Sequence, residues 1–311
     1  MVNSKAVPQA SKPVYLPFST GKWQLKPGLK PLRLEDWIQI DEEYLPYLQR
    51  KAELRAERCN DVFASLPGTE SAQQEILDVL VEHLLRYFPN QFERSPTSIT
   101  NHLTQETWQF ADFATTPLDL AGRLVQEDLC LMMPNENGYI LGAASLSFPS
   151  YWRLHDKLGR AIAPIHDPVP GYAQKLQHPV NTYFDRLQPD NPGYRLNWSI
   201  NDTPELFLGH AHAQRIDQPD ITAENAGDKL WIRIERQTLR RLPKTQVILF
   251  TIRIYTYPLS LLEQHPIAAA GLHSMLHQIP DDMQRYKSLI PIRSALQEYL
   301  AIKVKEQESR N

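Results

Sequence analysis

The chain has 311 residues, 42% of them hydrophobic and 22% charged, so it is long enough to bury a sizeable core without covalent cross-links. Its formal net charge of −3, with no run of five Lys or Arg residues, disfavours nucleic acid or an anionic membrane surface as a partner. The only cysteines are Cys59 and Cys130, which excludes a disulfide framework and a Cys-rich zinc or iron–sulfur site.

The N-terminal sequence and the glycines disfavour two further classes of protein. Residues 1–16 are interrupted by Pro8 and Pro13 and lack the apolar core of a signal peptide, and no apolar run in the chain reaches the length of a membrane span. We therefore expect a cytoplasmic protein. No two of the 12 glycines are separated by a single residue and no G-K-[ST] occurs, so an ordinary dinucleotide or P-loop site is excluded.

Residues 1–123 are predicted to form a helical N-terminal wrap. The first 70 residues contain many prolines, and a helix is favoured over residues 41–59. Ser71 and Gln74 form an S-x-x-Q capping box ahead of a second helix, which ends before Pro89. The apolar residues of this second helix recur at helical spacing and form one stripe: Ile76, Leu77, Leu80, Leu84 and Leu85.

Residues 124–257 show the pattern of several strands around one helical segment. Residues 125–133 and 139–148 are extended segments joined by a turn sequence that carries Gly138. A segment of helical and irregular character follows, residues 149–194, which is termed the insert. Three more strands are then predicted from their alternating apolar and polar residues, at 195–200, 230–242 and 247–257.

The order of these elements predicts an α+β fold. Two strands, a helical insert and three strands are the order of a PAS-like five-stranded antiparallel sheet, here flanked by N- and C-terminal helices. Residues 258–311 are predicted to be helical and to pack on the core formed by residues 124–257, so that the chain makes one integrated domain. PAS-like domains commonly hold a flat cofactor between the insert and the sheet, which is an analogy at the level of the fold.

His166 in the insert precedes a stretch that contains Pro168 and Pro170. Each proline restricts its own φ to near −65°, so the backbone around the imidazole has little freedom. A rigidly held imidazole suits an axial haem ligand, whose nitrogen must approach the iron along the haem normal. Taken alone, a histidine more often satisfies a local hydrogen bond, and both interpretations stay open at this point.

Five motifs occur in order along the chain. The second lies at the insert and consists of three stretches, residues 148–152, 157–160 and 165–172. The other four are residues 125–131, 195–198, 235–243 and 250–253. Together they resemble the haem-dependent oxidative N-demethylase alpha-subunit family. The resemblance extends from the region of Trp37 to the segment at Tyr286 and Lys287, which is nearly the whole chain.

The resemblance implies a PAS-like enzyme with haem b that uses dioxygen and electrons to oxidise the carbon next to an amine nitrogen. The carbinolamine product would collapse to a demethylated amine and formaldehyde. The I-H-D-P-V-P motif, together with the rigidity argument, assigns His166 as the axial ligand. Because no nucleotide fingerprint is present, we expect the electrons to come from a separate flavin and iron–sulfur reductase, with a small N-methyl amine as substrate.

The haem propionates would need cationic partners, and the planar fork of Arg suits a carboxylate. Glu235 and Arg236 point to opposite faces of a regular strand, so at most one of them faces the cofactor. The candidates for the propionates are Lys157, Arg160, Arg195, Arg236 and Arg241. Each could instead pair with a neighbouring carboxylate on the outer face of a strand.

An amine substrate is a cation at neutral pH, so a carboxylate or an aromatic face could hold it. The candidates for this role are Glu127, Trp152, Trp198 and Glu235. Trp is most often a core residue and Glu on a strand often forms a cross-strand ion pair, so a structural role remains open for each.

Competing sites are possible at other residues. His210 and His212 would lie on one side of a strand, and His273 with His277 would share a helix face, as in a metal site. Cys130 could in principle supply a thiolate to haem. The alternative functions are a haem-binding sensor without demethylase activity and a haem-free metal or interaction protein.

Overall fold

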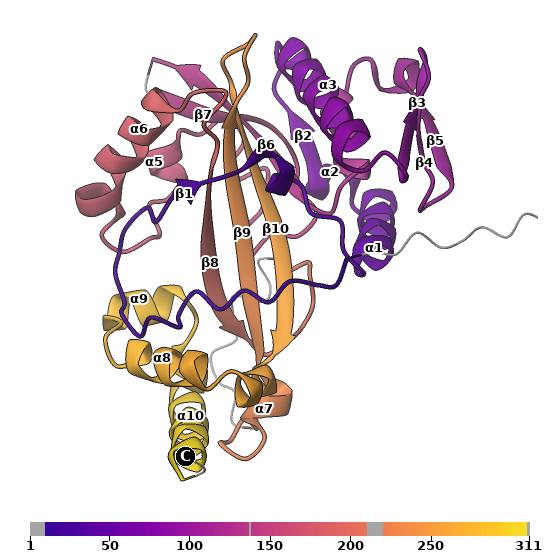
Figure 1. The fold of residues 1–311 in the computed structure, drawn as a ribbon. Helices are drawn as coiled ribbons and strands as arrows, with labels where there is room; N and C mark the ends of the chain where they lie inside the picture. The colour runs from indigo at the N-terminus through magenta and orange to yellow at the C-terminus, as the bar shows by residue number, and fades with distance from the viewer. Residues whose placement is uncertain (1–9, 137, 210–219, 310–311) are drawn as a thin grey trace, which may run out of the picture.

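A seven-stranded antiparallel sheet forms the centre of the computed structural model, which describes residues 10–136, 138–209 and 220–309 (Figure 1). The strand order across the sheet is β1-β8-β9-β10-β6-β7-β2. The strands are β1 (Lys30–Pro31), β2 (Phe63–Ser65), β6 (Asp128–Asn135), β7 (Gly138–Ser145), β8 (Gly193–Asn201), β9 (Trp231–Arg241) and β10 (Ile248–Pro258).

The α+β class is confirmed, and two details of the predicted fold are corrected. The sheet has seven strands rather than five, because β1 and β2 add a short strand at each edge. The N-terminal region is not only helical, since it also contains a three-stranded sheet of β3 (Phe92–Arg94), β4 (Ser98–Asn101) and β5 (Glu106–Gln109). Strands of two to four residues are too short for an alternating pattern to reveal them.

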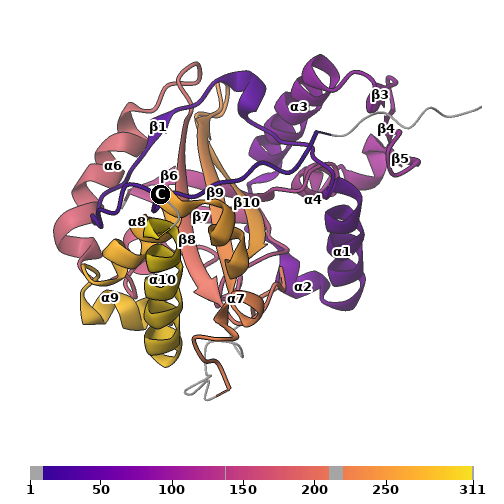
Figure 2. The ribbon, with the colours of Figure 1, turned by 60° about the horizontal axis from the view of Figure 1, so that its bottom comes forward.

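Helices cover both faces and one end of the large sheet. They are α1 (Tyr44–Glu57), α2 (Cys59–Val62), α3 (Glu70–Tyr87), α4 (Pro117–Arg123), α5 (Ile162–Ile165), α6 (Gln177–Arg186), α7 (Ala226–Lys229), α8 (Pro266–Leu276), α9 (Asp281–Tyr286) and α10 (Arg293–Glu308). Figure 1 shows α5 and α6 on one side of the sheet and α3 on the other. The C-terminal helices α8, α9 and α10 gather at one end, as Figure 2 also shows. In the part of the chain that the structure describes, no helix is both long and apolar enough to cross a membrane.

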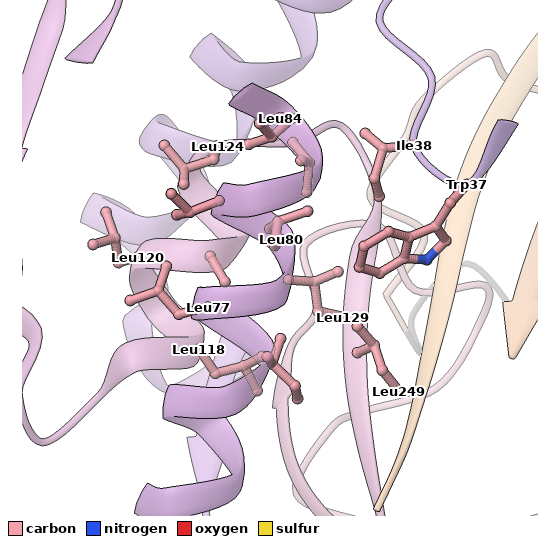
Figure 3. Close-up of a cluster of buried hydrophobic side chains, with 14 of the residues drawn as sticks. Trp37, Ile38, Leu77, Leu80, Leu84, Leu118, Leu120, Leu124, Leu129 and Leu249 are labelled. Atoms are coloured by element: carbon pink, nitrogen blue, oxygen red, sulfur yellow. The ribbon is translucent and has the colours of Figure 1, made fainter. Parts of the chain in front are cut away.

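The predicted apolar stripe of α3 packs on the sheet face opposite the insert, and Figure 3 shows its leucines on the side of Leu129 and Leu249. Leu77, Leu80 and Leu84 are buried together with residues of α4, β6 and β10. Each such leucine contributes about 1.5–3 kcal/mol relative to an exposed side chain. The predicted start of the helix is wrong: Thr69 is the N-cap and Ser71 lies inside the helix, so no Ser71 capping box forms. The Thr69 hydroxyl instead donates to the carbonyl oxygen of Leu66.

His83 on α3 is a buried histidine that stays neutral in the folded state. Burial, followed by the charges of Arg240 and Arg86, lowers the pKa of His83 to about 3. An unfolded histidine binds a proton near pH 6.5, so unfolding takes up a proton between these two values. We expect the free energy of unfolding to fall by about 1.4 kcal/mol per pH unit from this residue as the pH drops below 6.

The measurement is urea unfolding at pH 7 and pH 5 of the wild type, His83→Phe and a control, His102→Ala. His102 is 46% exposed and forms only a surface ion pair with Glu93, a kind of contact that contributes little to stability, so its removal is the matched control. A His83→Phe protein with the same pH dependence as the wild type would contradict the prediction.

The insert covers the other face of the sheet. Its buried side chains Tyr172, Leu176 and Phe184 pack against Cys130 of β6 and Leu239 of β9. The five residues Tyr172–Leu176 form one turn of π-helix ahead of α6. Because this layer and the α3 layer lie on opposite faces, both faces of the central strands are covered.

The N-terminal segment joins the C-terminal helices to the face opposite the insert. Phe18 is fully buried, and its ring lies 5.6 Å from that of Trp198 on β8. A Cβ on Gly271 of α8 would come within 2.4 Å of the Phe18 carbonyl oxygen, so only glycine allows this close approach. The segment around Phe18 is thereby held between the sheet and α8.

Candidate functional site

A strip of the sheet beneath the insert stays partly open to solvent and is termed the accessible strip. Its residues are Arg195, Asn197, Glu235, Gln237, Phe250 and Ile252. The strand register places them on one face, because Arg195 lies opposite Gln237, Asn197 opposite Glu235, and Gln237 opposite Ile252. All six are half-buried, whereas the intervening residues of the two central strands are buried. Solvent therefore reaches these strands from the insert side.

Glu235 is the most heavily hydrogen-bonded side chain of the accessible strip. Its Oε1 accepts from the Ser150 hydroxyl at 2.7 Å. Its Oε2 accepts from Gln237 Nε2 at 2.8 Å and from Asn197 Nδ2 at 3.3 Å. Donors from two strands and from the start of the insert thus hold one carboxylate against the sheet.

Arg195 brings a positive charge to the same strip. Burial lowers the pKa of its guanidinium, while the carboxylate of Glu235 acts in the opposite direction. Its Nε is buried and has no hydrogen-bond partner within the described residues. A buried donor without a partner costs about 1–3 kcal/mol, so a site of this kind favours an acceptor from outside the chain.

His166 lies directly after α5, as its C-cap residue. Its Nδ1 is 2.8 Å from the carbonyl oxygen of Ile162, so Nδ1 carries the hydrogen and Nε2 has the free lone pair. Burial lowers the pKa of His166, as do the nearby charges of Lys157 and Arg195, although the hydrogen bond to Ile162 opposes them. The imidazole is therefore neutral at pH 7, and Nε2 makes no hydrogen bond to a described residue.

The ring of Tyr172 stacks on that of His166, with centroids 4.7 Å apart and planes 8° from parallel. Tyr172 is buried, and no described residue hydrogen-bonds its hydroxyl group. The stacking fixes the plane of the imidazole, in addition to the restriction that Pro168 and Pro170 place on the backbone.

Lys157 also belongs to the surroundings of His166. Its Nζ donates to the carbonyl oxygen of Ile165 at 2.8 Å and lies 5.1 Å from the centre of the Trp152 ring. Burial lowers the pKa of Lys157, and the charge of Arg160 acts in the same direction. Arg160 itself is exposed and donates to the carbonyl oxygen of Asp156.

Arg236 and Arg241 lie away from His166. Arg236 points to the opposite face of the sheet, where it donates to the carbonyl oxygens of Asp36 and Trp37. Arg241 is on the insert side, but its guanidinium is occupied by the carbonyl oxygens of Leu187, Phe184 and Gln246 and by the Tyr139 hydroxyl. Both arginines thus have protein acceptors already.

Two of the four candidates for amine binding are also remote from His166. Glu127 is fully buried, and its Oε1 accepts from the backbone N–H of Gln39. Trp198 packs against Phe18 and the C-terminal helices, on the face opposite the accessible strip. Trp152 and Glu235 are the two that lie on the insert side.

The sequence model of the haem-dependent oxidative N-demethylase, alpha subunit-like family matches residues 28–297. The chain belongs to this family. The match includes the whole insert, the accessible strip and α9. The expected resemblance is thereby confirmed, and the name of the family indicates a haem-dependent oxidoreductase that is one subunit of a larger enzyme.

The residues around His166 suit a haem group. A neutral imidazole offers one unprotonated nitrogen as a ligand for iron. The Nε–H of Arg195, which has no acceptor among the described residues, can donate to a haem propionate. Phe250 and Ile252 of the accessible strip are half-buried apolar side chains on the same face of the sheet. The donor set is therefore of the kind that haem requires.

The competing sites receive less support from the geometry. His273 and His277 are neighbours on α8, with ring centroids 5.0 Å apart, yet the described residues contain no group of three His, Cys, Asp or Glu that could hold a metal ion. His210 and His212 lie outside the described residues. Cys130 is buried, and burial raises the pKa of its thiol, which opposes formation of a thiolate.

A groove of about 450 Å³ lies elsewhere, between residues 26–30 and α6. Tyr183 and Pro179 form its wall on α6, and no residue of the accessible strip borders it. The location of the candidate site therefore depends on the contacts of His166, Arg195 and Glu235.

Lys287 is a further neighbour of the accessible strip that the sequence did not indicate as a site residue. It reaches the strip from the C-terminal region of the chain.

Proposed function

We propose that the protein is the haem-binding oxygenase component of an oxidative N-demethylase. The observation that carries the proposal is the neutral imidazole of His166, whose Nδ1 is held by Ile162, whose Nε2 has no hydrogen-bond partner among the described residues, and whose pKa is lowered by burial and by the charge of Arg195 in the accessible strip. The family match over residues 28–297 supports haem as the group it serves. Haem b would supply the oxygen chemistry at the carbon next to the amine nitrogen.

We further propose that the core is PAS-like. Strands β6, β7, β8, β9 and β10 follow the expected order along the chain, with the insert between β7 and β8, and they are neighbours within one antiparallel sheet. The insert packs on one face only, and the half-buried accessible strip on that face is where we propose that a flat cofactor binds. The backbone N–H groups of Lys244 and Thr245 bind the carboxylate of Glu75 on α3, which supports a single domain for the whole chain.

The residues divide into three roles in this proposal. His166 binds the iron, and Tyr172 fixes the plane of its ring. Arg195 and Lys157 lie near His166 and bind the propionates, whereas Arg236 and Arg241 stabilise the fold through carbonyl oxygens. Glu235 faces the same strip as Arg195, and we propose that its carboxylate holds the substrate ammonium group, while Trp152 closes the site beside Lys157.

The proposed reaction also needs electrons that this chain does not supply by itself. The absence of a G-x-G-x-x-G sequence supports a separate flavin and iron–sulfur reductase, and "alpha subunit" in the name of the family supports further components. The partners proposed are therefore a reductase, dioxygen and a small N-methyl amine.

The test combines a spectrum with a product assay. Protein expressed with a haem precursor should show an intense Soret band, and with a reductase and an N-methyl amine it should release formaldehyde. A Soret band without formaldehyde from any N-methyl amine tested would indicate a haem-binding sensor. A colourless protein after haem reconstitution would overturn the proposal.

A further inference from the structure

Lys287 connects the C-terminal helices to the accessible strip. It is the residue after α9, and its Nζ donates to the carbonyl oxygen of Trp198 at 2.7 Å and to Asn197 Oδ1 at 3.4 Å. The same Nζ lies 4.7 Å from the centre of the Trp198 ring. Strand β1 pairs only with Gly193 and Tyr194 at this edge of β8, so the carbonyl of Trp198 is available to Lys287.

The bond from Lys287 determines which way the Asn197 amide points. Because the amide oxygen accepts from Lys287, the amide nitrogen faces Glu235 and donates to its Oε2. Rotation of this amide by a half-turn would place its oxygen against the carboxylate of Glu235. Lys287 therefore excludes the unfavourable orientation and adds one donor to the carboxylate.

The backbone at Lys287 is held in a conformation that places this side chain. Ser288 adopts a left-handed φ of 55°, which is uncommon for a residue other than glycine. The N–H of Leu289 donates to the carbonyl of Gln284, and the N–H of Ser288 donates to that of Arg285. These two bonds form a Schellman motif, which fixes the end of α9.

The neighbouring charges of Arg195 and Glu235 support a position for Lys287 at the candidate functional site. Burial, the largest cause, and the charge of Arg195 together lower the pKa of Lys287 to about 8, although the carboxylate of Glu235 acts in the opposite direction. Arg195, Glu235 and Lys287 thus share one environment, although they come from β8, β9 and the C-terminal region.

We propose that Lys287 is a positioning residue, which acts through Asn197 to hold the Glu235 carboxylate in the orientation that binds a substrate ammonium group. This inference rests on the proposed function, because that function gives Glu235 its cation. It makes the segment after α9 part of the site, and not only a cover for the sheet.

The test compares Lys287→Met, Lys287→Arg and Asn197→Ala in haem-reconstituted protein, with dimethylammonium as the probe and calorimetry as the measurement. Removal of a nearby positive charge would by itself strengthen the binding of a cation. A positioning role predicts the reverse: Lys287→Met binds about tenfold more weakly, equal to ~1.4 kcal/mol. Lys287→Arg should bind as the wild type does, because a guanidinium can donate to the same two acceptors.

The double variant shows whether Lys287 acts through Asn197. Adding Lys287→Met to Asn197→Ala should cause no further loss of affinity, since the two residues form one chain of contacts. Equal or tighter binding by Lys287→Met, or additive losses in the double variant, would overturn the inference.

A second measurement separates this inference from the proposed function. The side-chain amide signal of Asn197 in an NMR spectrum, assigned by its loss in Asn197→Ala, should shift in Lys287→Met without any added amine. If the wild type fails to bind dimethylammonium while this signal shifts, the amine-binding role of Glu235 is wrong and the contact role of Lys287 stands. An unshifted amide signal would overturn the role of Lys287 itself.

Discussion

His166→Ala is expected to lose its haem during purification. The variant removes the imidazole whose Nδ1 is held by Ile162 and whose pKa is lowered by burial and by the nearby charge of Arg195. Substitution of a residue that only hydrogen-bonds a metal ligand typically lowers the affinity for the metal about 10–100-fold. Loss of the ligand itself should lower it more. The measurement is the ratio of Soret to protein absorbance after equal reconstitution of wild type and variant.

The matched control is His178→Ala, which removes an exposed histidine from the same insert. It should keep the spectrum of the wild type. Imidazole added in excess to His166→Ala should restore part of the Soret band, which would show that the pocket has survived the substitution. A His166→Ala protein with full haem content and an unchanged spectrum would remove His166 from the proposal.

Asp128→Ala is expected to cause the largest loss of stability. Asp128 is fully buried, its Oδ1 lies 3.6 Å from Nζ of Lys51, and its two oxygens accept the N–H groups of Ser147 and Phe148. Removal of the carboxylate leaves the buried charge of Lys51 without its counter-ion, which typically costs about 3–5 kcal/mol. It also releases the segment that leads into the insert. Urea unfolding should show a lower midpoint with an unchanged m-value.

Asp61→Ala is the control for this substitution. Asp61 is 53% exposed and 4.0 Å from Arg58, so its removal should change stability by no more than about 0.5 kcal/mol. Replacing both buried partners, in Asp128→Ala with Lys51→Met, should be less damaging than Asp128→Ala alone, because no unpaired charge remains. A loss below about 1 kcal/mol in Asp128→Ala would contradict this account of the core, since the buried pair alone is expected to cost more.

Glu235 and Arg236 show what the alternation of residues along a strand predicts about a site and what it leaves undecided. The sequence indicates that these neighbours face opposite sides of the sheet, and the structure has Glu235 on the insert side and Arg236 on the other. The pattern could not say which of the two faces the insert covers. That choice depends on the packing of α3 against the face that carries Leu129 and Leu249.

Arg195 and Arg241 illustrate a second limit. Both lie on the insert side of neighbouring strands, and both carry the same charged group. Only the folded chain shows that the carbonyl oxygens of Leu187 and Phe184 accept from Arg241, while Nε of Arg195 has no acceptor among the residues that the structure describes. Backbone acceptors from distant loops leave no mark in the local sequence.

The sequence by itself determined the elements with long, regular patterns: the leucine stripe of α3, the alternation along β8, β9 and β10, the hairpin of β6 and β7, and the rigid stretch after His166. These features depend on backbone periodicity and on restricted φ angles, which neighbouring residues set among themselves. The tertiary structure alone decided the short edge strands, the accessible strip and the approach of Lys287 to Asn197. They depend on contacts between residues far apart in the sequence, such as Lys30 with Tyr194 and Lys287 with Asn197, which no local pattern encodes.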